Sequence, residues 1–196
     1  MSNQYISDAI FLDADGVLWK DVGAGGIFSG IDHAIQNLKL LSSNPTSSRL
    51  KIVISNQTFA ARNGMSYLKF KSYVKSFFDG LIKEGLLDDF AICYHHPNAK
   101  KIALRKKCKC RKPLPGLLHS MARKHQINMT KSVLIGDRIT DMQAGDAAGI
   151  KHLYLIINDQ MLEVNTNSTV QPIYQVFLPL KELNEYLLVM GLINED

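Results

Sequence analysis

Short apolar runs recur along the chain, and most of them stop at a polar or charged residue. Runs of this length between polar segments are typical of buried strands. The predicted strands cover residues 9–12, 51–54, 90–93, 132–135 and 153–156, with a short edge strand at 174–177. The predicted helices cover residues 30–42, 66–84 and 140–148, one that opens near Pro115, and one from Leu180. Strands that alternate with helices predict an α/β fold, a Rossmann-like parallel sheet with helices on both faces.

The longest predicted helix, residues 66–84, is expected to be amphipathic. Its apolar positions include Leu68, Tyr73, Phe77 and Leu81. We expect the phenylalanines and tyrosines of this helix to lie in the core, because they recur at helical spacing. The polar stretches 42–48 and 158–171 are expected to be loops.

The length and composition are those of an ordinary globular protein. With 196 residues, 46% apolar and 21% charged, the chain is predicted to form a single domain, residues 1–196, without a large cap domain. No apolar run reaches the roughly 20 residues that span a bilayer. Residues 1–5 lack a basic region followed by an apolar stretch, so we expect no secretory signal and a cytoplasmic protein.

Polar side chains follow the predicted strands directly. Asp13 and Asp15 flank Ala14 where the first strand stops, and Gly16 then allows a sharp turn. Ser55 follows the second strand. Each signal alone is more often a turn or a helix cap. However, parallel sheets bind ligands at the carboxyl ends of their strands, and a carboxylate pair there could supply the nucleophile and the acid of phosphoryl transfer.

Two later segments add the charges that such a reaction needs. Arg111 and Lys112 precede two prolines, and arginine binds phosphate in bidentate fashion while lysine acts as a point charge. Asp137 follows the fourth strand, with Asp141 four residues later. A carboxylate in this place suits a hard cation that takes oxygen ligands.

In this order the four segments closely resemble the haloacid dehalogenase superfamily of phosphatases, over residues 9–157. The matching residues are Asp13 and Asp15 in the first motif, Ser55 in the second, Lys112 in the third, and Asp137 in the fourth, with Asp141 following. The resemblance implies that Asp13 attacks phosphorus to form an aspartyl-phosphate and that Asp15 protonates the leaving oxygen and later activates water. It also implies that Mg²⁺ binds Asp13, the backbone carbonyl of Asp15, and Asp137. Ser55 and Lys112 would then hold phosphate oxygens.

All three cysteines lie near a histidine pair, in the pattern C-x-H…C-x-C. The residues are Cys93, His95, His96, Cys108 and Cys110. Four such ligands in two close pairs suit tetrahedral, structural zinc, and an odd number of cysteines argues against a disulfide framework. By spacing alone either histidine could be the fourth ligand; buried cysteines beside a surface histidine are the alternative to a metal site.

The cysteine pattern resembles the branch of the superfamily that contains D-glycero-D-manno-heptose 1,7-bisphosphate phosphatases and histidinol phosphatases. The resemblance implies a zinc-stapled loop in which the histidine ligand is His95. The loop ends at Arg111, so zinc is expected to fix the backbone that presents the two cations. Asn56, Arg62 and Arg111 are the candidate substrate-binding residues. Two departures bear on specificity: Ala14 stands where the family commonly has arginine, and the stretch 16–30 is shorter.

We therefore expect Mg²⁺-dependent hydrolysis of a small phosphorylated metabolite, by resemblance a heptose bisphosphate. Histidinol phosphate is the alternative small substrate. The net charge of +5 and the run of cations over residues 100–112 also suggest a nucleic-acid terminal phosphatase, but this run has no aromatic residues for base stacking, so we do not expect a nucleic-acid partner. A non-catalytic metabolite-binding protein on the same scaffold is the remaining alternative.

Overall fold

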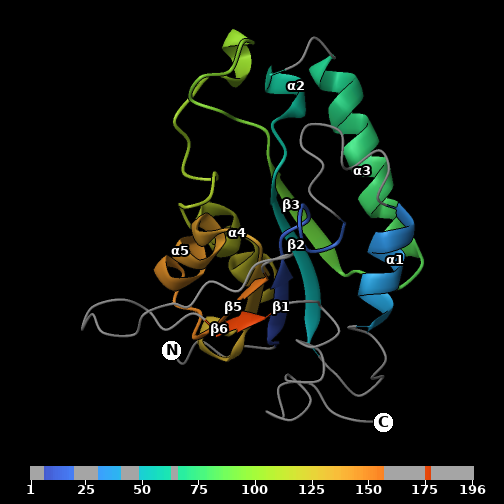
Figure 1. Ribbon diagram of the computed structural model, residues 1–196, viewed down its shortest axis with the longest axis vertical. Helices are drawn as coiled ribbons and strands as arrows, with labels where there is room; N and C mark the ends of the chain where they lie inside the picture. Colours follow the sequence, from blue (N-terminus) through green and yellow to red (C-terminus); the bar gives the residue numbers. More distant parts are fainter. Residues whose placement is uncertain (1–6, 20–30, 41–48, 63–65, 157–174, 178–196) are drawn as a thin grey trace.

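A computed structural model of the chain describes residues 7–19, 31–40, 49–62, 66–156 and 175–177. These residues form a six-stranded parallel sheet in the order β3-β2-β1-β4-β5-β6 (Figure 1). The strands are β1 (Ala9–Leu12), β2 (Leu50–Asn56), β3 (Asp89–Cys93), β4 (Val133–Gly136), β5 (His152–Ile156) and β6 (Gln175–Phe177). The predicted parallel sheet is confirmed, including its edge strand.

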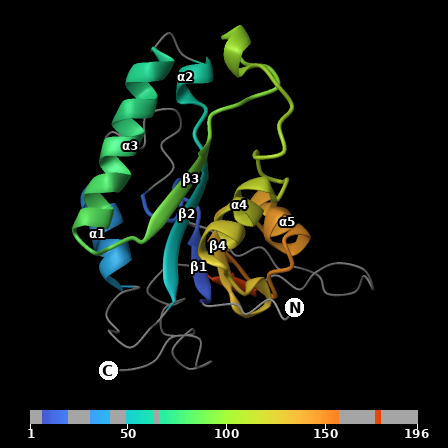
Figure 2. The same ribbon diagram turned by 180° about the vertical axis from the view of Figure 1, so that it is seen from behind.

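Helices cover both faces of the sheet, as predicted. They are α1 (Ile31–Leu40), α2 (Phe59–Arg62), α3 (Tyr67–Lys83), α4 (Gly116–His125) and α5 (Ile139–Ala147), with the 3₁₀ turns η2 (Ile102–Leu104) and η3 (Met129–Lys131). Helices α1 and α3 lie on one side of the sheet, and α4 and α5 on the other (Figure 2). The predicted helix from Leu180 and the predicted loops 42–48 and 158–171 fall outside the described residues.

The two hydrophobic cores follow from the alternation of side chains along the strands. Ile10 and Leu12 of β1 pack with α1 and α3, whereas Phe11 between them packs with α4 and α5. Strands buried on both faces read as continuous apolar runs, which is why the sequence pattern locates them. Within the described residues, no helix has the length and apolar character needed to cross a membrane.

The prediction for α3 was partly wrong. Phe70, Phe77 and Phe78 are buried, but Leu68 is 74% exposed and Tyr73 39% exposed. Leu68 lies two residues before Phe70, which places it roughly 200° around the helix, on the outer face. Tyr73 lies at the margin of the buried face.

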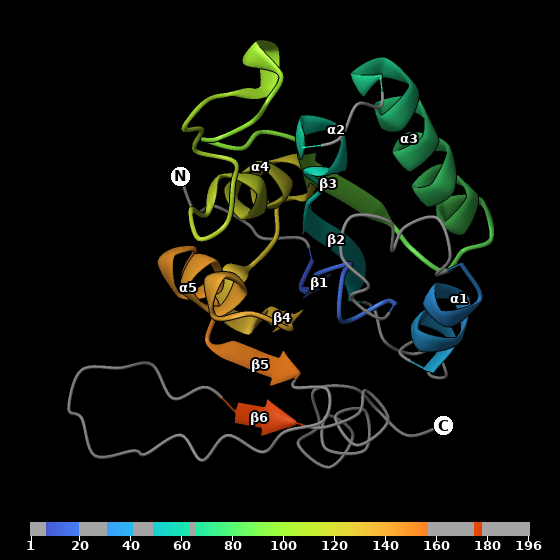
Figure 3. The same cartoon turned by 45° about the horizontal axis from the view of Figure 1, so that its top comes forward.

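The segments that follow β2 and β3 both extend beyond the carboxyl ends of the strands (Figures 1 and 3). After β3 the chain forms the Cys-bearing loop, which we define as residues 94–115. The amide of Lys100 in this loop donates to the carbonyl of Ala61 in α2 (3.0 Å), and Leu104 packs with Ala61. The loop is thereby held above the carboxyl ends of the strands, where the candidate site lies.

Candidate active site

The first motif is held where β1 meets β4. The amide of Asp13 donates to the carbonyl of Ile135 at 2.9 Å, which continues the pairing of the two strands beyond β1. Gly16 then turns with φ of +78°, and a Cβ on this residue would overlap the Asp137 carboxyl group. Glycine is therefore required at this position both for its backbone conformation and for its close approach to the next strand end.

Lys112 forms ion pairs with two buried carboxylates. Its Nζ lies 2.8 Å from Asp13 Oδ1 and 2.6 Å from Asp141 Oδ1, and it donates to the carbonyl of Ile54 at 2.8 Å. The lysine is only 4% exposed. Burial acts to lower the pKa of Lys112, but Asp13 and Asp141 outweigh it and raise that pKa, so the side chain stays charged.

Asn56 fixes the backbone of Lys112. Its Nδ2 donates to the Lys112 carbonyl and its Oδ1 accepts from the Lys112 amide, both at 3.2 Å. This paired contact joins the end of β2 to the third motif, across 56 residues of sequence. Asn56, expected to bind substrate, is thus placed to hold Lys112 in position.

Asp15 is held by two neutral donors. Trp19 Nε1 donates to Asp15 Oδ1 at 2.8 Å, and Gln57 Nε2 donates to Asp15 Oδ2 at 3.0 Å. Gln57 Nε2 also donates to Ser55 Oγ at 3.1 Å. These roles of Trp19 and Gln57 were not predicted from the sequence, although Gln57 follows Ser55 and Asn56 directly.

Asp137 is the least compensated acid of the site. Burial and the charges of Asp13 and Asp141 raise the pKa of Asp137 to about 7. Arg138 Nε lies 3.7 Å from Asp137 Oδ2, but the arginine side chain is 59% exposed, so water screens its charge. Asp137 Oδ1 is buried, and no hydrogen-bond donor reaches it among the residues that the structure describes.

Asp141 lies beside Asp137 in the first turn of α5. Burial and Asp13 raise the pKa of Asp141 to about 6, although its carboxyl group accepts from the Arg138 amide and contacts Lys112. A strand-end aspartate followed four residues later by a second one, in the first helical turn, is the sequence signal that locates it.

Carboxylate oxygens of Asp13, Asp137 and Asp141 lie within 4.8 Å of one another. One buried lysine does not offset three clustered acids, and the unsatisfied oxygen of Asp137 points to a missing positive partner. A hard divalent cation with oxygen ligands fits this donor set.

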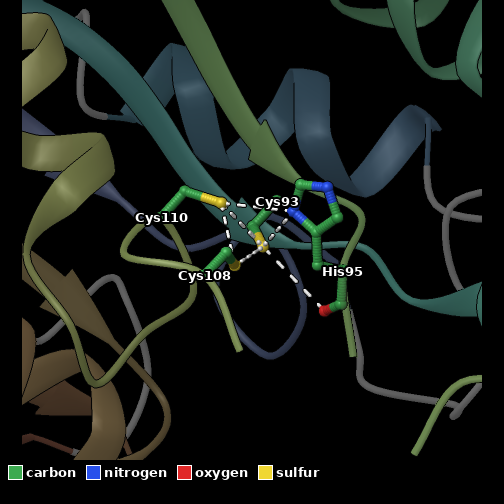
Figure 4. Close-up of side chains that lie close together, drawn as sticks. All are labelled: Cys93, His95, Cys108 and Cys110. Atoms are coloured by element: carbon green, nitrogen blue, oxygen red, sulfur yellow. Dashed lines mark hydrogen bonds between the residues drawn. The ribbon is translucent and has the colours of Figure 1, made fainter. Parts of the chain in front are cut away.

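A second cluster joins the last residue of β3 to the Cys-bearing loop (Figure 4). The ligand atoms of Cys93, His95, Cys108 and Cys110 lie within 4.8 Å of one another. Cys110 Sγ is 3.0 Å from Cys108 Sγ and 3.4 Å from His95 Nδ1. Three thiols and one imidazole in this arrangement fit a tetrahedral site with no open position, the form typical of structural zinc.

The geometry also separates the two histidines that spacing left open. His95 Nδ1 faces the cysteines, whereas His96 Nδ1 accepts from the Asn98 amide at 3.1 Å. Arg111 Nη1 donates to the His95 carbonyl at 3.2 Å, so this candidate substrate-binding residue also contacts the backbone of the Cys/His cluster. Arg62 is the last residue of α2, and its side chain is outside the described part of the structure.

Comparison with known proteins gives the family of the chain. A family model described as HAD-hydrolase-like matches residues 109–156. A D-glycero-alpha-D-manno-heptose-1,7-bisphosphate 7-phosphatase of Photorhabdus laumondii is 31% identical over 148 residues, which cover 74% of this chain and 80% of that protein. A D-glycero-beta-D-manno-heptose-1,7-bisphosphate 7-phosphatase of Yersinia pestis is 34% identical over 150 residues, covering 72% and 76%.

A solved structure shares the fold. The D,D-heptose 1,7-bisphosphate phosphatase of B. bronchiseptica, crystallised with magnesium and phosphate, superimposes with a TM-score of 0.68 at 23% identity, covering 93% of this chain and 99% of that one. The sheet is that of a HAD-like fold, and the matching family model and relatives make the chain a HAD-like phosphatase. The chain belongs to the haloacid dehalogenase superfamily, in the family of the D-glycero-D-manno-heptose 1,7-bisphosphate phosphatases.

Proposed function

We propose that the chain hydrolyses a phosphorylated sugar such as D-glycero-D-manno-heptose 1,7-bisphosphate through an aspartyl-phosphate on Asp13. The observation that carries the proposal is the convergence of Asp13, Ser55, Lys112 and Asp137 from four distant segments at one edge of the sheet. The names of the two bacterial relatives support the sugar substrate.

The residues divide the reaction between them. Asp13 is the nucleophile: its carboxylate oxygen bonds to phosphorus as the bond from phosphorus to the sugar oxygen breaks. Asp15 gives its proton to that leaving oxygen, and then takes a proton from the water that cleaves the aspartyl-phosphate. Ser55 and Lys112 hold phosphate oxygens, and the buried lysine supplies a positive charge where negative charge develops.

Asp13, Asp137 and the backbone carbonyl of Asp15 are the residues that we propose to hold Mg²⁺. When bound there, the ion would offset the charge of the phosphate and of the clustered carboxylates. The magnesium and phosphate in the B. bronchiseptica structure support this assignment. Asp141, which contacts Lys112, completes the acidic cluster.

Cys93, His95, Cys108 and Cys110 are the residues that we propose to hold structural Zn²⁺. Only Arg111 separates Cys110 from Lys112, so a fixed cluster also fixes the start of the phosphate-binding segment. Arg111 and Arg62 remain the proposed substrate contacts beyond the phosphoryl group.

The test is turnover of p-nitrophenyl phosphate and of heptose bisphosphate by wild type, by Asp13→Asn and by the exposed control Asp32→Asn, with magnesium present. We expect Asp13→Asn to lose at least about a thousandfold in kcat with an unchanged fold by circular dichroism, and the control to match wild type. Full activity of Asp13→Asn would overturn the mechanism. Turnover of p-nitrophenyl phosphate without turnover of any sugar phosphate would overturn the substrate class alone.

One observation keeps a nucleic-acid terminal phosphatase as a second candidate. Lys100, Lys106, Lys107 and Lys109 of the Cys-bearing loop are all exposed. Binding of a 5′-phosphorylated oligonucleotide, measured between about 50 and 200 mM salt, decides this point: a steep loss of affinity supports it and a flat response removes it. Histidinol phosphate belongs in the same substrate screen, because the cysteine pattern also resembles that of the histidinol phosphatases.

A further inference from the structure

The carboxyl group of Asp15 is held at both of its oxygens. Trp19 Nε1 donates to Oδ1 at 2.8 Å and Gln57 Nε2 donates to Oδ2 at 3.0 Å. A carboxyl group accepts hydrogen bonds in its own plane, so donors at both oxygens fix the orientation of that plane. Both donors are neutral side chains, one at each of the two oxygens.

Both donors are themselves rigidly placed. The Trp19 ring is 2% exposed and packs edge-on against Phe77, with ring centroids 5.4 Å apart. The Trp19 carbonyl accepts from the Gly16 amide at 2.8 Å, which closes the turn that carries Asp15. Gln57 is buried at the end of β2. Rotation of the Asp15 carboxyl group would break two partly buried hydrogen bonds at once.

We propose that Trp19 and Gln57 are positioning residues that hold Asp15 in the orientation from which it transfers a proton to the leaving oxygen. The inference rests on the proposed function, since it gives Asp15 the part of acid. It adds two residues that act on the reaction through Asp15, one from the turn after β1 and one from the end of β2.

Gln57 has a second contact that Trp19 lacks. Its Nε2 lies between Asp15 Oδ2 and Ser55 Oγ, both of which accept, so its two N–H groups are shared between the first and second motifs. The opposite amide orientation would set Oε1 against the Asp15 carboxylate, where two acceptors would repel each other. Because Ser55 Oγ accepts from Gln57, the Ser55 hydroxyl proton is available for a phosphate oxygen.

Leaving-group dependence tests the proposal. An alkyl phosphate needs a proton on its leaving oxygen, whereas p-nitrophenolate departs without one. We expect Trp19→Phe, which keeps a ring but removes the N–H donor, to lower kcat/KM for a sugar phosphate by about 10- to 100-fold and to lower it several-fold less for p-nitrophenyl phosphate. Gln57→Met should show the same split and also weaken inhibition by inorganic phosphate, because it loses the contact to Ser55.

Phe77→Leu is the matched packing control. It loosens the contact around the Trp19 ring and keeps the donor, so it should lower kcat/KM equally for both substrates. Equal losses for both substrates in Trp19→Phe would overturn the proposal and assign Trp19 a packing role. A double mutant adds a second readout: with Asp15→Asn present, Trp19→Phe should cost less than about threefold further, since residues that act through one group are not additive.

Asp15→Asn separates the acid role of Asp15 from the positioning role of Trp19. If Asp15→Asn shows no greater loss for the sugar phosphate than for p-nitrophenyl phosphate, then the proposed role of Asp15 as acid is wrong. If Asp15→Asn shows that split and Trp19→Phe does not, then the role of Asp15 stands and the positioning role alone is wrong.

Discussion

In the absence of magnesium, the folded protein should lose stability as pH rises, and Asp137→Asn should remove most of that loss. Burial, with the charges of Asp13 and Asp141, raises the pKa of Asp137 from 3.8 to about 7. The folded protein therefore keeps this proton up to about pH 7, while the unfolded chain releases it above about pH 4. Unfolding releases a proton within that window, so the free energy of unfolding falls as pH rises through it.

The size of the effect follows from the shift in pKa. A shift of about 3 units corresponds to about 4 kcal/mol once pH exceeds both pKa values, and about 2–3 kcal/mol of it develops between pH 5 and 7.5. A neutral asparagine cannot ionise, so the variant should lack this contribution. At about pH 7.5 without magnesium, Asp137→Asn should therefore be more stable than wild type, although it lacks a proposed metal ligand.

Urea denaturation at about pH 5 and pH 7.5, without added magnesium and with the zinc content verified, measures the effect. The control is Asp79→Asn, which removes an exposed carboxyl group paired with Lys75 on α3. We expect this control to keep the slope of wild type. Magnesium should stabilise wild type at the higher pH and have little effect on Asp137→Asn. If the stability of Asp137→Asn falls with pH as steeply as that of wild type, Asp137 is not the group that causes the loss.

Two further predictions concern the loop and the first turn. Wild type should contain about one zinc per chain by metal analysis. Replacement of Cys108 and Cys110 by serine should abolish zinc binding and lower kcat at least about tenfold, because Lys112 follows Cys110 closely in the chain. Full turnover without zinc would contradict this prediction. Gly16→Ala should destabilise by about 1–3 kcal/mol in thermal unfolding, because of its positive φ and the close carboxyl group, whereas Gly80→Ala on α3, where a Cβ meets nothing within 4 Å, should not destabilise. Equal effects of the two alanine substitutions would contradict the structural role of Gly16.

The sheet could be predicted from sequence because its strands are buried on both faces and end at polar residues. The runs that stop at Asp13, Ser55 and Asp137 define the edge where the site lies, and parallel pairing brings those strand ends together. The Cys93–His95 and Cys108–Cys110 pairs were equally informative, since thiols and an imidazole at this spacing are typical of a tetrahedral zinc site.

The contacts around Asp15 could not be predicted in the same way. Whether the Trp19 ring turns its N–H towards Asp15 or away depends on how the ring packs with Phe77, and that depends on a helix more than fifty residues later in the chain. The pairing of Lys112 with Asp141 likewise joins two segments whose relative placement only the folded chain determines. Leu68 was misplaced because apolar character alone does not say which face of a helix meets the sheet.

His95 and Cys108 flank the outer part of the Cys-bearing loop, residues 96–107, and both belong to the cluster of thiols and imidazole. Length or sequence changes in that part would leave both of its ends where they are. The inner part, from Cys110 to Gly116, is different: it is short, the Gly116 amide is bonded to the Lys109 carbonyl at 3.0 Å, and it carries Lys112. Evolution or design could therefore vary the outer part while the segment that carries Lys112 keeps its place.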